Sequence, residues 1–200
     1  MARDGSTSWR NAFFKNRGAL LALPAVALAG FGKPSPTSIG IGIPIAVLGE
    51  ALRCWAVGYS GVTTRADHVT APALTTAGPY AYVRNPLYVG NFITALGFSI
   101  AYTGGLSPAR RALATALGLG TMLGVYAAIV PLEETYLRET FGDAFDAYVA
   151  RVPRLVPRTS PSEPQAGTYD SGVIATAETR TFVTFGAMLA VLALKARSAD

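Results

Sequence analysis

The chain has 200 residues, of which 50% are hydrophobic and only 14% charged, whereas soluble domains average about 25% charged residues. This composition argues against a soluble globular domain. The formal net charge of +5 does not indicate nucleic-acid binding, because basic residues flank membrane spans for topological reasons. With a single cysteine, Cys54, the chain can form neither a disulfide framework nor a multi-cysteine metal site by itself, and we expect no metal.

Long apolar runs predict an all-α integral membrane bundle of about five transmembrane helices. No charged residue lies between Pro86 and Ala109 or between Ala112 and Leu132, and each run can cross a hydrocarbon core about 30 Å thick. Three weaker runs complete the bundle, and we treat residues 1–200 as one domain. The five predicted helices cover residues 13–31, 39–59, 86–105, 111–130 and 179–196.

The first apolar run has two interpretations. Basic residues precede it, and Ala27-Leu28-Ala29 resembles a signal-peptide cleavage site. We favour an uncleaved span, because further spans follow at once.

The second predicted helix contains two charges, Glu50 and Arg53, which lie three residues apart and can pair on one helical face. A charge pair within a span usually faces the protein interior. The alternative is that both residues lie near the membrane interface.

Three glycines of the fourth predicted helix, Gly118, Gly120 and Gly124, include a Gly-x-x-x-Gly step. Small residues let membrane helices approach closely, so we expect these glycines at a helix–helix contact. The single histidine, His68, is expected in a loop rather than as a ligand.

Residues 133–151 are too charged to span a membrane. Leu137, Phe141, Phe145 and Tyr148 recur at helical spacing, which predicts an amphipathic helix on the cytoplasmic interface after the fourth span. Four prolines then predict an irregular segment over residues 152–172.

The distribution of Lys and Arg predicts the orientation of the chain. With five spans and the N-terminus inside, eleven basic residues lie on one side and five on the other. The positive-inside rule then places the N-terminus, the 61–85 loop and the 132–180 segment in the cytoplasm. We therefore expect a protein of the cytoplasmic membrane whose active site faces the cytoplasm.

The third predicted helix begins at a polar corner. Gly78-Pro79 marks a turn, and Asn85 before Pro86 is typical of an N-cap followed by proline at the first helical position. Arg84 adds a positive charge beside the positive end of the helix dipole, so the corner could hold a carboxylate or phosphate. Aromatic faces that attract cations come from Tyr80, Tyr82 and Tyr88.

Two adjacent carboxylates, Glu133 and Glu134, follow the fourth predicted helix and could hold a cationic group. Because the third and fourth helices are antiparallel if both span, their cytoplasmic ends lie together and the Glu pair can meet Arg84. Two simpler interpretations remain. The corner could be an interfacial anchor, and Glu134 could pair with Arg138 along a surface helix.

A spaced set of residues runs through the middle of the chain. It comprises Gly78 to Gly90, Glu133-Glu134, Leu137, Phe141-Gly142, Tyr148 and Val152-Pro153-Arg154. Over about residues 74–158 this set resembles the isoprenylcysteine carboxyl methyltransferase family, which groups with phospholipid N-methyltransferases. The family pattern has histidine at the position of Asn85 and tyrosine at that of Phe145. Asparagine caps helices and donates hydrogen bonds but is no general base.

The resemblance implies that the chain is an enzyme that uses S-adenosylmethionine as methyl donor, in a cytoplasm-facing pocket without a metal. It implies catalytic roles for Arg84, Asn85 and Glu134. The residues implied in donor binding are Tyr80, Tyr82, Arg84, Asn85, Pro86, Tyr88, Glu133 and Glu134.

We predict methyl transfer to a lipid or another hydrophobic small molecule, with membrane lipids as partners and no obligate protein partner. Methylation of an isoprenylated cysteine carboxylate is the alternative enzyme function. A catalytically silent binding or scaffold protein that keeps the fold is the alternative of another class.

Overall fold

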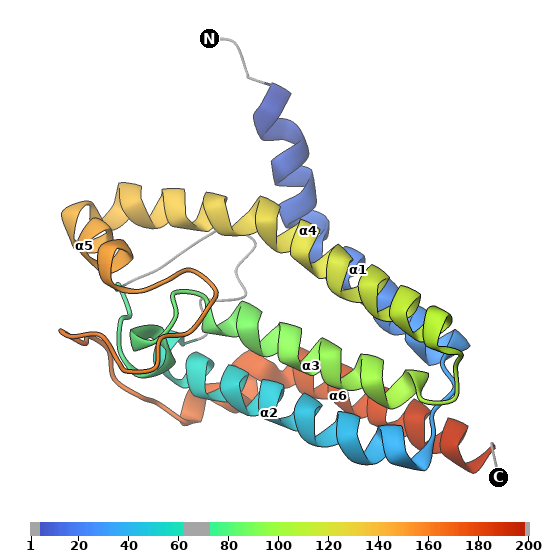
Figure 1. Cartoon of the computed structure of the whole chain (residues 1–200). Coiled ribbons are helices and arrows are strands. Elements are labelled where there is room, and N and C mark those ends of the chain that lie inside the picture. Colours follow the sequence, from blue (N-terminus) through green and yellow to red (C-terminus); the bar gives the residue numbers. More distant parts are fainter. Residues whose placement is uncertain (1–4, 62–72, 199–200) are drawn as a thin grey trace. The chain divides into compact units, whose positions relative to one another are not determined.

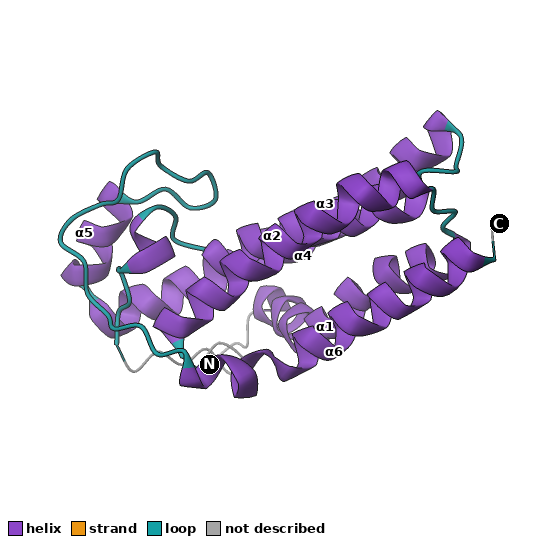
Figure 2. Ribbon diagram, turned by 90° about the horizontal axis from the view of Figure 1, so that it is seen from below, coloured by secondary structure: helices purple, strands orange, loops and turns teal. Residues whose placement is uncertain are grey.

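The computed structural model describes residues 5–61 and 73–198, with side chains from Gly18 onwards. Within these ranges all regular secondary structure is helical and no strand occurs, which confirms the predicted all-α class (Figures 1 and 2). The elements in order are α1 (Gly5–Phe31), α2 (Pro36–Ser60), the short 3₁₀ helix η2 (Gly78–Ala81), α3 (Pro86–Thr103), α4 (Pro108–Phe141), α5 (Asp143–Arg151) and α6 (Gly172–Arg197).

Three helices of the described residues, α2, α4 and α6, are long and apolar enough to cross a membrane. The apolar part of α1, Gly18–Phe31, is shorter, and α3 has 18 residues. The five-span count therefore stays a prediction, while the membrane-spanning character of the chain is supported by three helices.

The chain forms two compact units. The first comprises Met1–Ala46, Ala95–Leu132 and Gly186–Asp200, and the second comprises Val47–Thr94 and Glu133–Phe185. All eight residues expected to bind the donor belong to the second unit. The single-domain assignment stays a prediction.

Aromatic and aliphatic side chains of α3, α4 and α6 form the core of the first unit, where Ala101, Tyr102 and Ile129 are completely buried. The Tyr102 hydroxyl donates a 2.6 Å hydrogen bond to the Met188 carbonyl. This bond joins α3 to the C-terminal helix and satisfies a polar group that burial would otherwise destabilise.

Of the three glycines expected at a helix–helix contact, only Gly118 lies at one among the described residues, because its added Cβ would be 3.7 Å from the Pro24 Cβ of α1. A Cβ added to Gly120 or Gly124 would meet no described atom within 4 Å, so the expected packing role is not borne out there. In the first unit, a Cβ on Gly97 of α3 would instead lie 2.6 Å from the Gly42 carbonyl oxygen of α2. In the second unit, a Cβ on Gly49 would lie 2.7 Å from the Gly90 oxygen. Each close approach therefore pairs a glycine of α2 with a glycine of α3, and the Gly-x-x-x-Gly pattern along α4 did not indicate it.

The bounds of α4 differ from the prediction. We expected the span to end near Val130 and a separate surface helix to cover residues 133–151, but α4 continues through Pro131 to Phe141. The residues after Pro131 are mostly good helix formers, which explains why one proline does not end the helix. Gly142 ends it with φ +51°, a positive φ that glycine adopts at lower cost than other residues do, and α5 follows. The prediction of one continuous amphipathic helix is therefore wrong.

The apolar residues of the predicted amphipathic stretch pack within the second unit. Phe145, Tyr148 and Val152 form a buried cluster, against which Leu137 and Phe141 pack. Burial within the protein therefore accounts for their helical spacing. The position of α5 at a membrane interface stays a prediction.

Three other helices also extend beyond their predicted ends, whereas α3 begins at Pro86 as predicted and ends at Thr103. α1 begins at Gly5 rather than Phe13, α2 begins at Pro36, and α6 begins at Gly172 rather than Thr179. The segment between α5 and α6 is irregular, as its prolines predict.

The irregular segment after α5 is bound to the loop that precedes α3. The Thr76 amide donates to the Ala166 oxygen at 2.8 Å, and the Ser162 amide donates to the Ala81 oxygen at 2.9 Å. Backbone hydrogen bonds thus hold together two stretches without regular structure.

The charge pair of α2 faces the interior of the second unit. Glu50 and Arg53 are 8% and 7% exposed, and the Arg53 Nε lies 3.6 Å from a Glu50 carboxylate oxygen. The Arg53 Nη2 also donates to both oxygens of Glu178 on α6, at 2.9 and 2.8 Å. Asn91 of α3 accepts from Nη1. This result favours the interior interpretation over the interfacial one.

Candidate functional site

The polar corner predicted from the sequence is formed by the loop before α3, which turns as expected. Gly78 has φ +61°, and its added Cβ would collide with the Tyr59 ring, so only glycine fits. η2 follows, and the Arg84 amide then donates to the Pro153 oxygen at 2.9 Å. The backbone thereby fixes Arg84 two residues before the start of α3.

The Arg84 guanidinium lies among protein acceptors. Its Nε donates to Glu134 Oε1 at 3.0 Å, and Nη2 lies 3.0 Å from the same oxygen. Nη1 donates to the Val149 and Val152 carbonyls. The side chains of Arg84 and Glu134 are 9% and 8% exposed. The predicted meeting of the corner with the Glu pair is therefore confirmed.

A second guanidinium completes this network. Arg154 Nε donates to Glu134 Oε1 at 3.1 Å, and Arg154 Nη2 donates to Glu134 Oε2. The Glu134 carboxylate is thus held between two arginines. The Arg154 side chain remains 50% exposed, so it is the more accessible cation. The hydrogen bond with Glu134 raises the pKa of Arg154, which keeps it charged.

The network changes the expected roles of its members. We expected Arg84 and Glu134 to bind opposite charges of one ligand, but in the structure they bind each other. Arg84 engages protein acceptors through Nε, Nη1 and Nη2, which favours a role in orienting Glu134. Arg154 belongs to the matching motif but was not among the predicted site residues. The Val152-Pro153-Arg154 motif in the sequence could have indicated Arg154 as a site residue.

Asn85 occupies the predicted N-cap position. Its carbonyl accepts hydrogen bonds from the Tyr88 and Val89 amides at 3.1 and 3.2 Å, as the carbonyl of an N-cap residue does. Its side-chain Nδ2 donates to the Arg154 carbonyl at 3.1 Å. Asn85 therefore acts as a donor that links α3 to the segment carrying Arg154, and Pro86 is the first residue of α3.

The three tyrosines of the corner have different surroundings. The Tyr88 hydroxyl donates to Glu133 Oε1 at 2.7 Å. Glu133, like Glu134, is therefore connected to the corner at the start of α3. The Tyr82 ring lies 6.4 Å from that of Trp55. The carbonyl of Tyr80 accepts a 2.8 Å hydrogen bond from the Tyr148 hydroxyl. Burial raises the pKa of Tyr80 to about 12 and also raises that of Tyr148, so both phenols are neutral at physiological pH.

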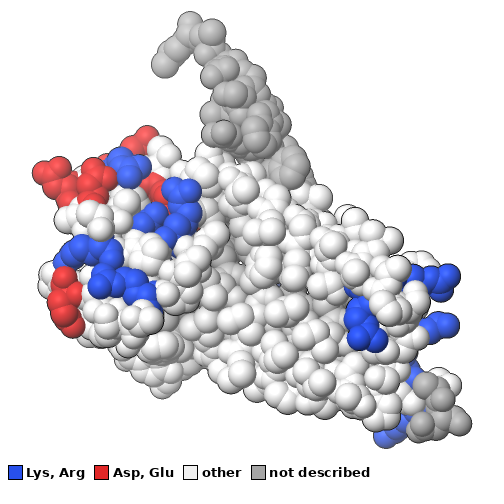
Figure 3. All heavy atoms as spheres, in the orientation of Figure 1, with Lys and Arg blue, Asp and Glu red and all other residues white. Residues whose placement is uncertain are grey.

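The simpler interpretation of Glu134 is wrong. Arg138, its proposed helical partner, instead donates to Asp146 Oδ1 at 2.7 Å and lies 5.5 Å from the centre of the Phe145 ring. Charged side chains gather over this part of the second unit (Figure 3). Among them, Glu134 belongs to the buried network and Arg138 to the surface.

No group of three or more His, Cys, Asp or Glu side chains that could hold a metal ion occurs among the described residues. The predicted loop position of His68 lies outside those residues.

Helices long and apolar enough to span a bilayer, together with a charged network at the start of α3, define an integral membrane protein with a polar site. The model of the family described as phospholipid methyltransferase matches residues 37–144. The chain belongs to this family. The match includes Arg84, Tyr88 and Glu134 but ends before Arg154 and α6.

Of three curated relatives, two have methyltransferase names, and one is named a metal resistance protein. The chain is 34% identical over 116 residues to protein-S-isoprenylcysteine O-methyltransferase of Schizosaccharomyces pombe, covering 55% of this chain and 45% of the relative. It is 32% identical over 120 residues to cobalt-zinc-cadmium resistance protein CzcN of Cupriavidus metallidurans, covering 60% and 48%. It is 31% identical over 123 residues to protein-S-isoprenylcysteine O-methyltransferase B of Arabidopsis thaliana, covering 58% and 57%.

The chain thus spans about half the length of these relatives. No solved structure matches it.

Proposed function

We propose that this protein is a membrane-embedded methyltransferase that uses S-adenosylmethionine and methylates a lipid or another hydrophobic small molecule. The observation that carries the proposal is the Arg84–Glu134–Arg154 network, in which Arg84 and Glu134 are buried and Arg154 is half-exposed. It joins the loop before α3, the end of α4 and the segment after α5. Intramembrane or interfacial ionisable groups are costly to bury, so a network of this kind supports a functional role.

The residues present fit the proposed donor by charge. S-adenosylmethionine has a carboxylate, an ammonium and a sulfonium, and it supplies an electrophilic methyl group. Arg154, with its half-exposed guanidinium, suits the carboxylate. Glu133, held by Tyr88, suits a cationic group. Arg84 and Glu134 then serve to position Arg154, and Asn85 fixes the backbone that carries it.

The chemistry proposed for these residues is orientation rather than proton abstraction. Asn85 cannot act as a base near neutral pH, and the raised pKa of Tyr80 makes its phenolate rare. A rigid network can contribute by holding two reactants in line, a contribution that reaches about 7–11 kcal/mol in well-oriented systems. The acceptor itself then supplies the nucleophile.

We further propose that α1 and α3 complete a five-span arrangement whose charged corner faces the cytoplasm. The excess of Lys and Arg on that side supports this orientation. In the same arrangement, the α5 region lies near the cytoplasmic interface, where a hydrophobic acceptor can reach the site from the bilayer.

Two other functions make different predictions. The relatives named isoprenylcysteine O-methyltransferases favour a prenylated cysteine carboxylate as the alternative acceptor, whereas a scaffold protein would bind no methyl donor. Identifying the molecule that receives the methyl group distinguishes the two enzyme functions. Measuring donor binding distinguishes either enzyme from a scaffold protein.

The test has two stages. Purified protein is first titrated with S-adenosylmethionine by calorimetry in detergent, and then incubated with methyl-labelled donor and native lipid extract. Arg154→Gln should weaken donor binding by roughly 10- to 150-fold, the loss of a charge-assisted hydrogen bond of about 1.5–3 kcal/mol. The matched control is Arg138→Gln, which removes an exposed arginine. Absence of donor binding in the unaltered protein would refute the proposal, and equal affinity in both variants would remove Arg154 from the site.

A further inference from the structure

Between Gly18 and Ser198, the charged side chains of the first unit are all basic. Between Gly18 and Ser198, the segments of this unit contain no Asp or Glu. Basic side chains gather at one end of the unit (Figure 3). The basic residues in this range are Lys33, Arg110, Arg111, Lys195 and Arg197. Their charge is therefore not neutralised by any carboxylate of the first unit within this range.

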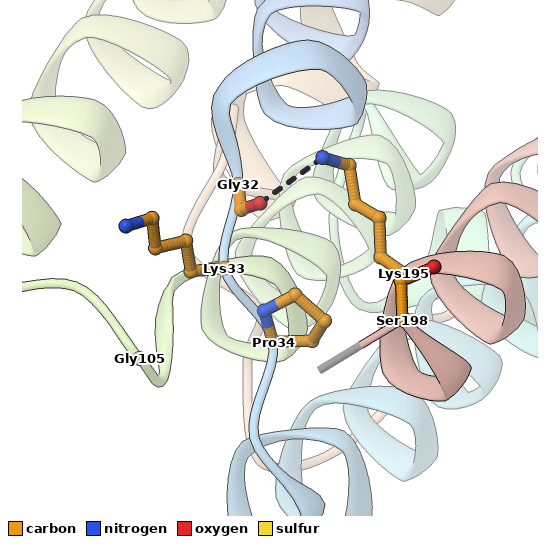
Figure 4. A pocket seen from close by; sticks show the side chains of 6 residues that line it. All are labelled: Gly32, Lys33, Pro34, Gly105, Lys195 and Ser198. Atoms are coloured by element: carbon orange, nitrogen blue, oxygen red, sulfur yellow. Dashed lines mark hydrogen bonds between the residues drawn. The ribbon is translucent and has the colours of Figure 1, made fainter. Parts of the chain in front are cut away.

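Two of these basic residues, Lys33 and Lys195, line a hollow of about 410 Å³. It is lined by Gly32, Lys33, Pro34, Gly105, Lys195 and Ser198 (Figure 4). Two of the six residues are lysines and the other four are uncharged. The hollow therefore combines an open volume with positive charge.

Lys195 is held in place by the end of α1. Its Nζ donates to the Gly30 carbonyl at 3.0 Å and to the Gly32 carbonyl at 3.2 Å, and Figure 4 shows it pointing toward Gly32. A cation at a helix C-terminus is favourable because the last carbonyls lack helical partners. This bond leaves the ammonium with its full positive charge.

The other side of the hollow is fixed by the α3–α4 turn. The Gly105 amide donates to the Lys33 carbonyl at 2.7 Å, which holds the backbone of Lys33. Arg111 donates to the Gly104 carbonyl at 2.7 Å. The Lys33 ammonium itself has no hydrogen-bond or ion-pair partner among the described residues, and its side chain is exposed.

The helices that lead to the hollow expose large apolar side chains. Phe31 of α1, Leu113 of α4 and Leu194 of α6 are 83%, 60% and 63% exposed. Such side chains suit contact with acyl chains. Basic residues at the ends of membrane helices lie at the depth of lipid headgroups.

We propose that the Lys33–Lys195 hollow binds the phosphate group of an anionic phospholipid. The first unit offers no carboxylate between Gly18 and Ser198 for the ammonium of a zwitterionic headgroup, so net-negative headgroups are preferred. The proposal is independent of methyl transfer, because the hollow belongs to the first unit and the charged network to the second.

The experiment is native mass spectrometry of the full chain in detergent, with titration of phosphatidylglycerol, phosphatidylcholine and inorganic phosphate. Lys33→Gln is the main variant because no described contact depends on that side chain, and Lys33→Arg is its charge-preserving control. The unaltered protein should prefer phosphatidylglycerol, and Lys33→Gln should weaken its binding about fivefold, as expected for one basic residue near an anionic headgroup. Lys33→Arg should bind as the unaltered protein does.

Three outcomes would overturn the proposal. Equal binding of the two lipids would mean that the headgroup charge is not recognised. Unchanged phosphatidylglycerol affinity in Lys33→Gln would place the lipid elsewhere. Inorganic phosphate binding as tightly as phosphatidylglycerol would make the hollow a site for free anions.

Discussion

The buried charges around Arg53 allow a quantitative prediction about how α6 is held. Arg53 on α2 donates to both carboxylate oxygens of Glu178 on α6, and their side chains are 9% and 1% exposed. Replacement of one partner of a buried ion pair leaves an uncompensated charge and costs about 3–5 kcal/mol. We therefore predict that Arg53→Met lowers the free energy of unfolding by this amount.

The charge balance predicts an order among the variants. Arg53→Met leaves Glu50 and Glu178 without their common cation, whereas Glu178→Gln leaves Arg53 with Glu50 at 3.6 Å. Glu178→Gln should therefore cost less than Arg53→Met. Combining both changes removes the cation and one carboxylate, so the double variant should be more stable than Arg53→Met alone.

The assay is thermal or denaturant unfolding of each purified variant in detergent. Arg138→Gln is the control, because Arg138 and Asp146 are 49% and 54% exposed and such surface pairs contribute about 1 kcal/mol or less. If Arg53→Met were no less stable than Arg138→Gln, the buried pair would not hold α6 and the reasoning from burial would fail.

Two further predictions concern glycine packing and topology. Gly97→Ala should destabilise the protein by about 1–3 kcal/mol, because the new methyl would collide with backbone. Gly120→Ala should stabilise it by up to about 1 kcal/mol through helix propensity, because its Cβ meets no described atom within 4 Å. The opposite signs in parallel melting curves are the check. For topology, single cysteines at Thr37 and Thr159, in a Cys54→Ser background, should react with a membrane-impermeant thiol reagent from opposite sides. Reaction from the same side would contradict the proposed orientation.

The helix class and the position of the charged corner could be predicted from sequence because they depend on local signals. Asn85 before Pro86 indicates a helix start, and α3 begins at Pro86. Antiparallel helices bring Arg84 and Glu134 to the same end, and the two side chains do meet. These predictions required only the antiparallel direction of consecutive spans and the residue preferences of helix N-termini.

The missed features depend on tertiary contacts. Arg154 reaches Glu134 from a proline-rich segment that has no periodicity, so no pattern showed which way its side chain lies. The pairing of Arg84 with Glu134, rather than with a ligand, depends on distances that a sequence does not contain. The charge of residues 133–151 suggested that the span ends near Val130, but the contacts of Leu137 and Phe141 with the Phe145 cluster favour a longer helix.

The glycines shared by α2 and α3 constrain how the chain can change in evolution. Gly42 contacts the Gly97 region in the first unit, Gly49 contacts the Gly90 region in the second, and each helix spaces its two glycines by seven residues. Inserting or deleting one residue between either pair would rotate one glycine by about 100° around the helix axis and bring a side chain against the neighbouring backbone. Length variation among homologues should therefore be concentrated in the connecting loops, while these two eight-residue stretches keep a constant length.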